Sequence, residues 1–270
     1  MGVDAVVKAA PDAGSPSRRE RERRTHRASG LRGWQFELVL LLAIVLAGAL
    51  TVLARTAAYF AIDLQITRAL QSIQAPWLGT VLHAVSWTGF PPQVNVLAGI
   101  LIVCLFLAGL RLEAGMIVLL GLGGAAIWFA LTWYVDRPRP SPDLVHVAVQ
   151  IPAGSFPSGH VLNLTAVCGF LMYVVTRRVA DKLLRRLVIL LLAVLVVTMG
   201  ISRVYDGGHW PSDVLGGYLF GGIWLALGIR IYTWARVSAG HGAAQPDLVQ
   251  PDLVQPNLAQ THPARPGPGG

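Results

Sequence analysis

Blocks of apolar residues long enough to cross a lipid bilayer recur along this chain and constrain its fold more than any other feature. A bilayer's hydrocarbon core is roughly 30 Å thick and takes about 20 residues of α-helix to cross. Only 13% of the residues are charged, whereas soluble domains carry about 25%. The predicted fold class is therefore all-α, a polytopic membrane protein with about six transmembrane helices in a bundle. The six expected spans are Leu38–Leu53, Val94–Leu110, Gly115–Tyr134, Val161–Thr176, Leu187–Ile201 and Val214–Trp234.

The composition divides the chain into three parts. Residues 34–236 form the predicted membrane domain. Residues 1–33 are basic and lack apolar periodicity, which predicts a disordered cytoplasmic tail. Residues 237–270 are rich in Pro and Gly and repeat the run Pro-Asp-Leu-Val-Gln, which predicts a disordered low-complexity tail. The first apolar block follows a longer polar stretch than a signal peptide has, so we interpret it as an uncleaved span; a cleaved signal peptide is the alternative.

Two segments between the first and second spans have a less definite pattern. The segment from Arg55 to Trp77 places polar side chains among apolar ones at helical spacing, which predicts an amphipathic helix on the membrane surface. The apolar piece from Val81 to Phe90 is too short to span and ends at two prolines. It fits either a re-entrant segment or the start of a kinked helix.

The distribution of positive charge predicts the orientation. The formal net charge is +8, and seven arginines crowd into the N-terminal tail. A second basic cluster lies in the loop around Lys182. Basic loops stay in the cytoplasm, so both termini should be cytoplasmic and loops 55–93, 135–160 and 202–213 should be extracytoplasmic. The tail suits anionic lipid headgroups, and because it lacks groove-reading elements we expect no nucleic-acid partner.

The first of three polar motifs in these outer loops is Phe156-Pro157-Ser158-Gly159-His160, directly before a predicted span. A helix that opens there exposes free backbone amides and the positive end of its dipole, which together bind anions such as phosphate. The plainer interpretation is that Ser158 caps the helix and His160 is passive.

The second motif places His209 four residues before Asp213, with Pro211 suited to the first turn of the last helix. A carboxylate on the same face can hold the Nδ1 proton and leave Nε2 as a nucleophile. The alternative is a His–Asp pair that only caps the helix.

Arginines complete the set. Arg137 and Arg139 alternate with prolines after the third span, and Arg203 precedes His209 by six residues. Positioned arginines stabilise the charge that develops on the phosphate oxygens during phosphoryl transfer. A basic loop that touches lipid headgroups is the alternative for Arg137 and Arg139.

Taken together, these motifs resemble the three-part signature of the type 2 phosphatidic acid phosphatase superfamily, which includes bacterial acid phosphatases and vanadium haloperoxidases. The resemblance spans roughly residues 36–235 and implies that His209 attacks phosphorus, oriented by Asp213, while His160 protonates the leaving oxygen. It also implies that Arg139, Arg203, Ser158 and Gly159 bind the phosphate. No metal and no cofactor are implied.

One position departs from this signature. The family usually has a lysine seven residues before the motif arginine, and here that residue is Thr132. Either Arg137 supplies the missing positive charge or Thr132 donates a hydrogen bond to a phosphate oxygen.

The expected function is that of an integral membrane, metal-independent phosphatase whose substrate is a lipid phosphate in the surrounding membrane. Its site should lie on the extracytoplasmic face. A polyprenyl pyrophosphate is the preferred substrate, followed by phosphatidic acid and phosphatidylglycerol phosphate. Two alternatives stay open: a non-catalytic protein that binds or transports a lipid phosphate, and a vanadate-dependent halide oxidase.

Overall fold

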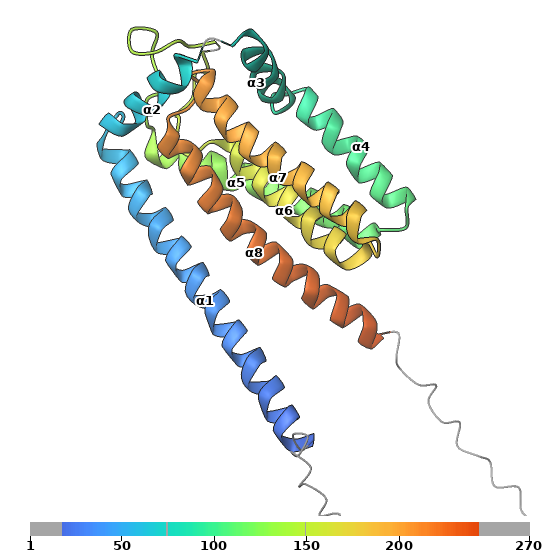
Figure 1. Cartoon of the computed structure of the whole chain (residues 1–270). Helices are drawn as coiled ribbons and strands as arrows, with labels where there is room; N and C mark the ends of the chain where they lie inside the picture. Colours follow the sequence, from blue (N-terminus) through green and yellow to red (C-terminus); the bar gives the residue numbers. More distant parts are fainter. Residues whose placement is uncertain (1–17, 74, 149, 243–270) are drawn as a thin grey trace, which may run out of the picture. The chain divides into compact units, whose positions relative to one another are not determined.

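The computed structural model describes residues 18–73, 75–148 and 150–242, and all regular structure in these ranges is helical (Figure 1). The helices in chain order are α1 (Arg18–Thr56), α2 (Ala61–Gln71), α3 (Pro76–Thr88), α4 (Gln93–Leu107), α5 (Arg111–Val135), α6 (Gly159–Arg178), α7 (Lys182–Tyr205) and α8 (Pro211–Gly242).

Five of these helices are long and apolar enough to cross a membrane: α1 from Trp34 onward, α5, α6, α7 and α8 to Ser238. Helices α3 and α4 pass the same test only as a pair, bent by 66° at the break between them. The all-α membrane fold is confirmed, with five spans or six if the bent pair counts as one.

The second predicted span needs correction, because α4 has only 15 residues and is too short to cross alone. The break before it lies at Pro91 and Pro92. Proline has no amide hydrogen and its ring clashes with the preceding turn, so a continuous helix cannot pass through both residues. The short piece before the prolines belongs to α3, which makes it part of a broken span or a re-entrant loop.

Helix α6 lies between α5 and α7 in the bundle, and α3 packs against α7 while α4 packs against α5 (Figure 1). The main apolar core joins α5, α6 and α8. Its buried members include Leu120, Phe170 and Tyr232, and the rings of Phe170 and Tyr232 meet edge to face with centroids 5.2 Å apart.

Glycines bring α8 into backbone contact with α6. A Cβ atom at Gly217 would lie 2.9 Å from the carbonyl oxygen of Ser158, and one at Gly221 would lie 2.6 Å from that of Leu162. Both separations are too short for a side chain. These small residues therefore allow the close approach of two helices that is common in membrane proteins.

The described residues at both ends of the chain are helical. Helix α1 begins at Arg18 and α8 continues to Gly242, so the structure has helix at residues 18–33 and 237–242, which the sequence assigned to the tails. The Arg and Glu residues before Gly30 are good helix formers, and their helix continues directly into the first span. The rest of the predicted tails, 1–17 and 243–270, lies outside the described residues. The chain forms one compact unit up to Tyr232, and residues 233–242 of α8 belong to a second unit.

Helix α2 is shorter than the predicted surface helix, and some of its polar residues are buried while some of its apolar residues are exposed. Asp63 and Thr67 are buried, whereas Ile62 and Ile66 are exposed. The apolar face of α2 therefore points away from the protein, and its carboxylate points into the polar end of the bundle.

The opposite end of the bundle holds a second buried carboxylate. Glu113, at the start of α5, accepts a hydrogen bond of 2.6 Å from Nη2 of Arg178 and another of 2.6 Å from the hydroxyl of Tyr232. Glu113 is 3% exposed. These two contacts connect α5, α6 and α8 at the end of the bundle opposite the polar motifs.

Candidate active site

The three polar motifs converge at one end of the bundle, where α5 ends and α6 and α8 begin. After α5, Asp136 adopts a left-handed conformation (φ 46°) that ends the helix and turns the chain. Asparagine and aspartate tolerate this conformation better than most residues. The turn directs Arg137 and Arg139 back toward the first turn of α8.

His209 lies in the short connection between α7 and α8 and is 2% exposed. Its Nδ1 atom lies 2.7 Å from the carbonyl oxygen of Ser155, which can only accept a hydrogen bond. The Nδ1 atom must therefore carry the proton, and Nε2 holds the lone pair. Burial, with the charges of Arg139 and Arg203, holds the pKa of His209 well below its ordinary value of 6.5, so the ring is neutral and nucleophilic at physiological pH.

The sequence-based expectation for Asp213 differs from this geometry. The nearest carboxylate oxygen of Asp213 lies 3.8 Å from Nδ1 of His209, beyond hydrogen-bond distance. That oxygen accepts instead from the backbone amide of Trp210 at 2.8 Å. The carbonyl of Ser155 fixes the tautomer, and Asp213 does not hold the Nδ1 proton.

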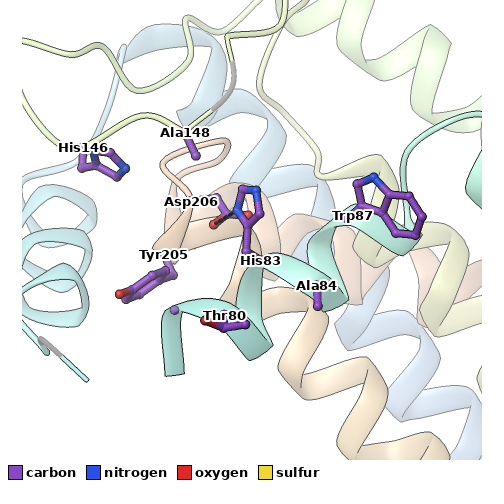
Figure 2. Close-up of a pocket in the computed structure, with 9 residues that line it drawn as sticks. Thr80, His83, Ala84, Trp87, His146, Ala148, Tyr205 and Asp206 are labelled. Atoms are coloured by element: carbon purple, nitrogen blue, oxygen red, sulfur yellow. Dashed lines mark hydrogen bonds and ion pairs between the residues drawn. The ribbon is translucent and has the colours of Figure 1, made fainter. Parts of the chain in front are cut away.

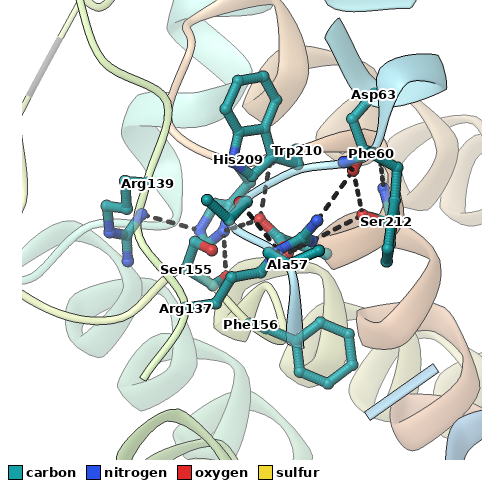
Figure 3. A network of polar contacts seen from close by, with 12 residues as sticks. Ala57, Phe60, Asp63, Arg137, Arg139, Ser155, Phe156, His209, Trp210 and Ser212 are labelled. Atoms are coloured by element: carbon teal, nitrogen blue, oxygen red, sulfur yellow. Dashed lines mark hydrogen bonds and ion pairs between the residues drawn. The ribbon is translucent and has the colours of Figure 1, made fainter. Parts of the chain in front are cut away.

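Two arginines lie on the other side of His209. Nη1 of Arg139 is 3.2 Å from Nε2 of His209 (Figure 3). The same Nη1 also donates to the carbonyl oxygen of Gly208, while Nε and Nη2 donate to those of Ala153 and Gly154. Nη1 of Arg203 donates to the hydroxyl of Ser86 at 2.5 Å. Burial lowers the pKa of Arg139 from its usual value, because removal from water destabilises the charged guanidinium.

Several buried polar atoms at the site have no hydrogen-bond partner among the described residues. They are Oγ of Ser158, Nε2 of His160 and Nε of Arg203. Buried polar groups are nearly always paired, so their grouping indicates a place for a polar ligand. Ser158 stands at the N-cap position of α6, yet its side chain makes no capping bond. The plain capping interpretation of Ser158 is therefore wrong.

The structure brings His160 to the same place. Arg203, His209 and Arg139 lie close enough for their charges to act on its ring. The ring of Phe90 packs edge-on against His160 at 4.7 Å between centroids and also lies under the guanidinium of Arg203. Gly159 forms the first residue of α6 beside Trp128.

Neither candidate replacement for the family lysine is directed at the unpaired atoms of Ser158, His160 and Arg203. The hydroxyl of Thr132 donates to the carbonyl oxygen of Phe156 at 3.3 Å. The guanidinium of Arg137 is buried and contacts Asp63, Ser212 and Asp213. Arg137 therefore does not supply the missing positive charge, because its donors are already used on the far side of Asp213.

Sequence reasoning missed three contributors to the site: Asp63, Ser86 and the carbonyl of Ser155. Asp63 was the only one with a usable signal, since a carboxylate among apolar residues near a membrane is costly unless it is paired. Ser86 resembles any other helix serine in the sequence, and a backbone carbonyl has no sequence signal.

A cavity of about 630 Å³ opens beside this cluster, between α3, the end of α7 and the loop around His146 (Figure 2). A smaller cavity of about 270 Å³ adjoins it and reaches Arg203 and Gly208. The two cavities share His83, Trp87 and Asp206. Nδ1 of His83 lies 3.3 Å from the carboxylate of Asp206 at this junction.

The sequence model of the PAP2 superfamily matches residues 100–236, just over half of the chain. The chain belongs to the PAP2 superfamily. The match contains the segments that carry Arg139, His160 and His209. Within the described ranges, no group of three His, Cys, Asp or Glu side chains is placed so as to hold a metal ion.

Similar proteins include phosphatidylglycerophosphatase B of Bacillus subtilis (strain 168), 30% identical over 162 residues that cover 59% of this chain and 77% of the relative. The putative undecaprenyl-diphosphatase YbjG of Escherichia coli (strain K12) is 29% identical over 182 residues, covering 60% and 84%.

Among solved structures, a transmembrane PAP2 type phosphatidylglycerolphosphate phosphatase from Bacillus subtilis has a TM-score of 0.65 at 24% identity, covering 72% of this chain and 96% of the other. Aquifex aeolicus LpxE has a TM-score of 0.52 at 22% identity, covering 63% and 96%. These structures establish the shared fold.

Proposed function

We propose that this PAP2 protein is an integral membrane lipid phosphatase that works through a phosphohistidine at His209. The observation that carries the proposal is the state of the His209 ring. Its Nδ1 proton is held by a carbonyl oxygen, and its Nε2 lone pair faces Arg139. The unpaired atoms of Ser158, His160 and Arg203 gather at the same place.

In the first step, Nε2 of His209 forms a bond to phosphorus while the bond from phosphorus to the leaving oxygen breaks. That oxygen is the lipid ester oxygen in a monoester and the bridging oxygen in a pyrophosphate. The leaving oxygen takes a proton from Nε2 of His160, whose protonated form is favoured by the negative charge of the bound phosphate. In the second step, neutral His160 accepts a proton from water as the water oxygen attacks phosphorus, and the bond from phosphorus to nitrogen breaks. Arg139 and Arg203 neutralise charge on the phosphate oxygens in both steps.

We propose a lipid phosphate monoester or pyrophosphate as substrate, with a polyprenyl pyrophosphate first and phosphatidic acid or phosphatidylglycerol phosphate next. Similarity to a phosphatidylglycerophosphatase and to a putative undecaprenyl-diphosphatase supports both headgroup classes. The paired cavities support a substrate larger than phosphate alone, since they lead away from Arg203.

The test is phosphate release by purified protein in detergent, with a panel of pyrophosphate and monophosphate lipids. We expect activity in the wild type and a loss of at least about 1,000-fold in His209→Ala. Glu113→Gln is the matched control, because it alters a buried polar residue at the other end of the bundle. Binding of a lipid phosphate without turnover of any lipid would instead favour the non-catalytic alternative.

A covalent intermediate can be tested directly. Denaturation in detergent at alkaline pH during turnover of a lipid labelled in its terminal phosphate should trap label on the wild type, stable in base and released by acid, and none on His209→Ala. Vanadate should inhibit. Halide oxidation upon addition of vanadate would support the oxidase instead.

We propose that both termini are cytoplasmic and that the site faces the extracytoplasmic side. Reporter fusions after Pro142 and after Lys182 test this orientation. We expect an extracytoplasmic signal at Pro142 and a cytoplasmic one at Lys182. The reverse pattern would contradict the outward-facing site.

A further inference from the structure

Arg137 lies between two buried carboxylates, one on each side of its guanidinium (Figure 3). Nη1 lies 2.6 Å from Oδ1 of Asp213, and Nη2 lies 3.0 Å from Oδ2 of Asp63. All three side chains are at most 1% exposed. The remaining guanidinium donor, Nε, lies 3.2 Å from the carbonyl oxygens of Ala57 and Ala58.

Both carboxylates have only donors around them. Asp63 accepts from the amide of Phe60 at 3.1 Å, from the amide of Ser212 at 2.9 Å and from the Ser212 hydroxyl at 2.7 Å. Asp213 accepts from the amide of Trp210 in addition to Arg137. A carboxylate that only accepts hydrogen bonds is in its ionised form. The cluster of Asp63, Arg137 and Asp213 therefore carries a net charge of −1.

The net charge of this cluster is important because His209 would become positively charged in the proposed reaction. When Nε2 bonds to phosphorus while Nδ1 keeps its proton, the imidazole ring becomes a cation. Asp213 is the nearest carboxylate to that ring, 3.8 Å from Nδ1. Paired with Arg137 alone, Asp213 would belong to a neutral pair and would stabilise the cation poorly.

We propose that Asp63 of α2 is a positioning residue for catalysis. Its negative charge offsets the positive charge of Arg137, so that Arg137 does not cancel the negative charge of Asp213. This inference rests on the proposed phosphohistidine mechanism. Asp63 touches neither the phosphate-binding groups nor His209, and acts through Arg137. A buried environment with few mobile charges makes such an interaction stronger than it is in water.

Asp63 also fixes the start of α8. Its Oδ1 accepts the backbone amide of Ser212, one of the first-turn amides that have no partner inside the helix. Its Oδ2 holds the Ser212 hydroxyl, which in turn accepts from Arg137 at 2.7 Å. Asp63 thus orients both the residue next to Asp213 and the arginine that holds Asp213.

The test compares kcat with phosphate affinity in Asp63→Asn, which keeps the shape of the side chain and removes its charge. We expect kcat and the rate of phosphoenzyme formation to fall at least about tenfold, with the inhibition constant of inorganic phosphate within about twofold. Asp63→Glu should recover part of the loss. Glu113→Gln is the control, since it removes a buried carboxylate that also pairs with an arginine, and its kcat should stay within about twofold.

A second variant separates charge from folding. Asp63→Asn with Arg137→Gln restores the net charge of −1, so we expect a kcat above that of Asp63→Asn and within about tenfold of the wild type. If Asp63→Asn alone does not fold, the kcat of the double variant is compared with that of the wild type only.

The proposal is overturned by an unchanged kcat in Asp63→Asn, by equal changes in kcat and phosphate affinity, or by a double variant more than about tenfold below the wild type. An inactive wild type would contradict the proposed function, whereas an active wild type with an unaffected Asp63→Asn would contradict only the role of Asp63.

Discussion

The carbonyl oxygen of Ser155 lies 2.7 Å from Nδ1 of His209, closer than either oxygen of the Asp213 carboxylate. A backbone carbonyl cannot take up a proton at physiological pH or rotate away. The tautomer of His209, the proposed nucleophile, is therefore fixed by the main chain of the loop that precedes α6.

The neutral state of His209 predicts a dependence of stability on pH. Burial and the two arginines lower its pKa in the folded protein, so below about pH 6.5 the unfolded chain binds a proton that the folded chain does not. Stability then falls as the pH falls. We expect the melting temperature of the wild type, relative to His209→Gln in the same detergent, to decrease between pH 7.5 and 5.5. A constant difference would contradict the lowered pKa.

Ser86 should matter for phosphate affinity because its hydroxyl holds Arg203. Removing a hydrogen bond to a charged group costs about 1.5–3 kcal/mol. We expect Ser86→Ala to raise KM for the lipid and the inhibition constant of phosphate about tenfold, with a smaller change in kcat. Ser72→Ala, which removes an exposed hydroxyl bonded within α2's last turn, is the control and should match the wild type.

Thr132→Lys restores the residue that the family pattern has at this position. The Thr132 hydroxyl is bonded to a carbonyl oxygen, so its loss should not remove a contact to phosphate. The charge of the new lysine should strengthen phosphate binding, and we therefore expect activity to be preserved or KM to fall by about threefold to tenfold. Thr132→Val should stay within about threefold of the wild type. Full loss of activity in folded Thr132→Lys would mean that the threonine has a required role of its own.

The cavity beside α3 should hold part of a lipid substrate. Ala84 lines it, and Ala84→Trp would fill much of its volume. We expect kcat/KM to fall at least about tenfold for a lipid phosphate and to change less than about twofold for a small soluble phosphate ester. Equal losses with both substrates would show that the cavity has no role in lipid recognition.

Gly221 and Gly222 provide a matched pair for testing the packing of α8 on α6. A methyl group at Gly221 would meet the carbonyl oxygen of Leu162 at 2.6 Å, whereas one at Gly222 meets nothing within 4 Å. We expect Gly221→Ala to destabilise the protein by about 1–3 kcal/mol and Gly222→Ala to leave the melting temperature unchanged or slightly higher. Equal effects would contradict the backbone contact.

Hydropathy located every long span within a few residues, because the length of an apolar helix is set by the bilayer and not by its neighbours. It failed at α4 and α2, whose boundaries depend on tertiary context. Nothing local in the sequence says whether Asp63 faces water or Arg137. The motif residues were found because they are consecutive or helically spaced, whereas Ser86 contributes from a distant helix.

Arg137 is the instructive error. Its position two residues before Arg139 suggested a shared role, because residues i and i+2 of an extended segment lie on the same face, but the structure directs the two side chains to different partners. Arg139 reaches His209 while Arg137 reaches Asp213 and Asp63. The structure separates two arginines that the sequence places together.

The glycine contacts between α6 and α8 have a consequence for how substrate range can change. Helix α6 begins directly after Ser158, and Asp213 lies in the first turn of α8. The backbone amide of Ser158 donates to the carbonyl oxygen of Asp213 at 3.0 Å, so the two helices also meet at the site. Because their backbones already touch, side-chain substitutions cannot bring α6 and α8 closer together at these glycines. The cavities are lined instead by α3, the end of α7 and the loop around His146, so we expect differences in substrate range to arise from substitutions in those segments.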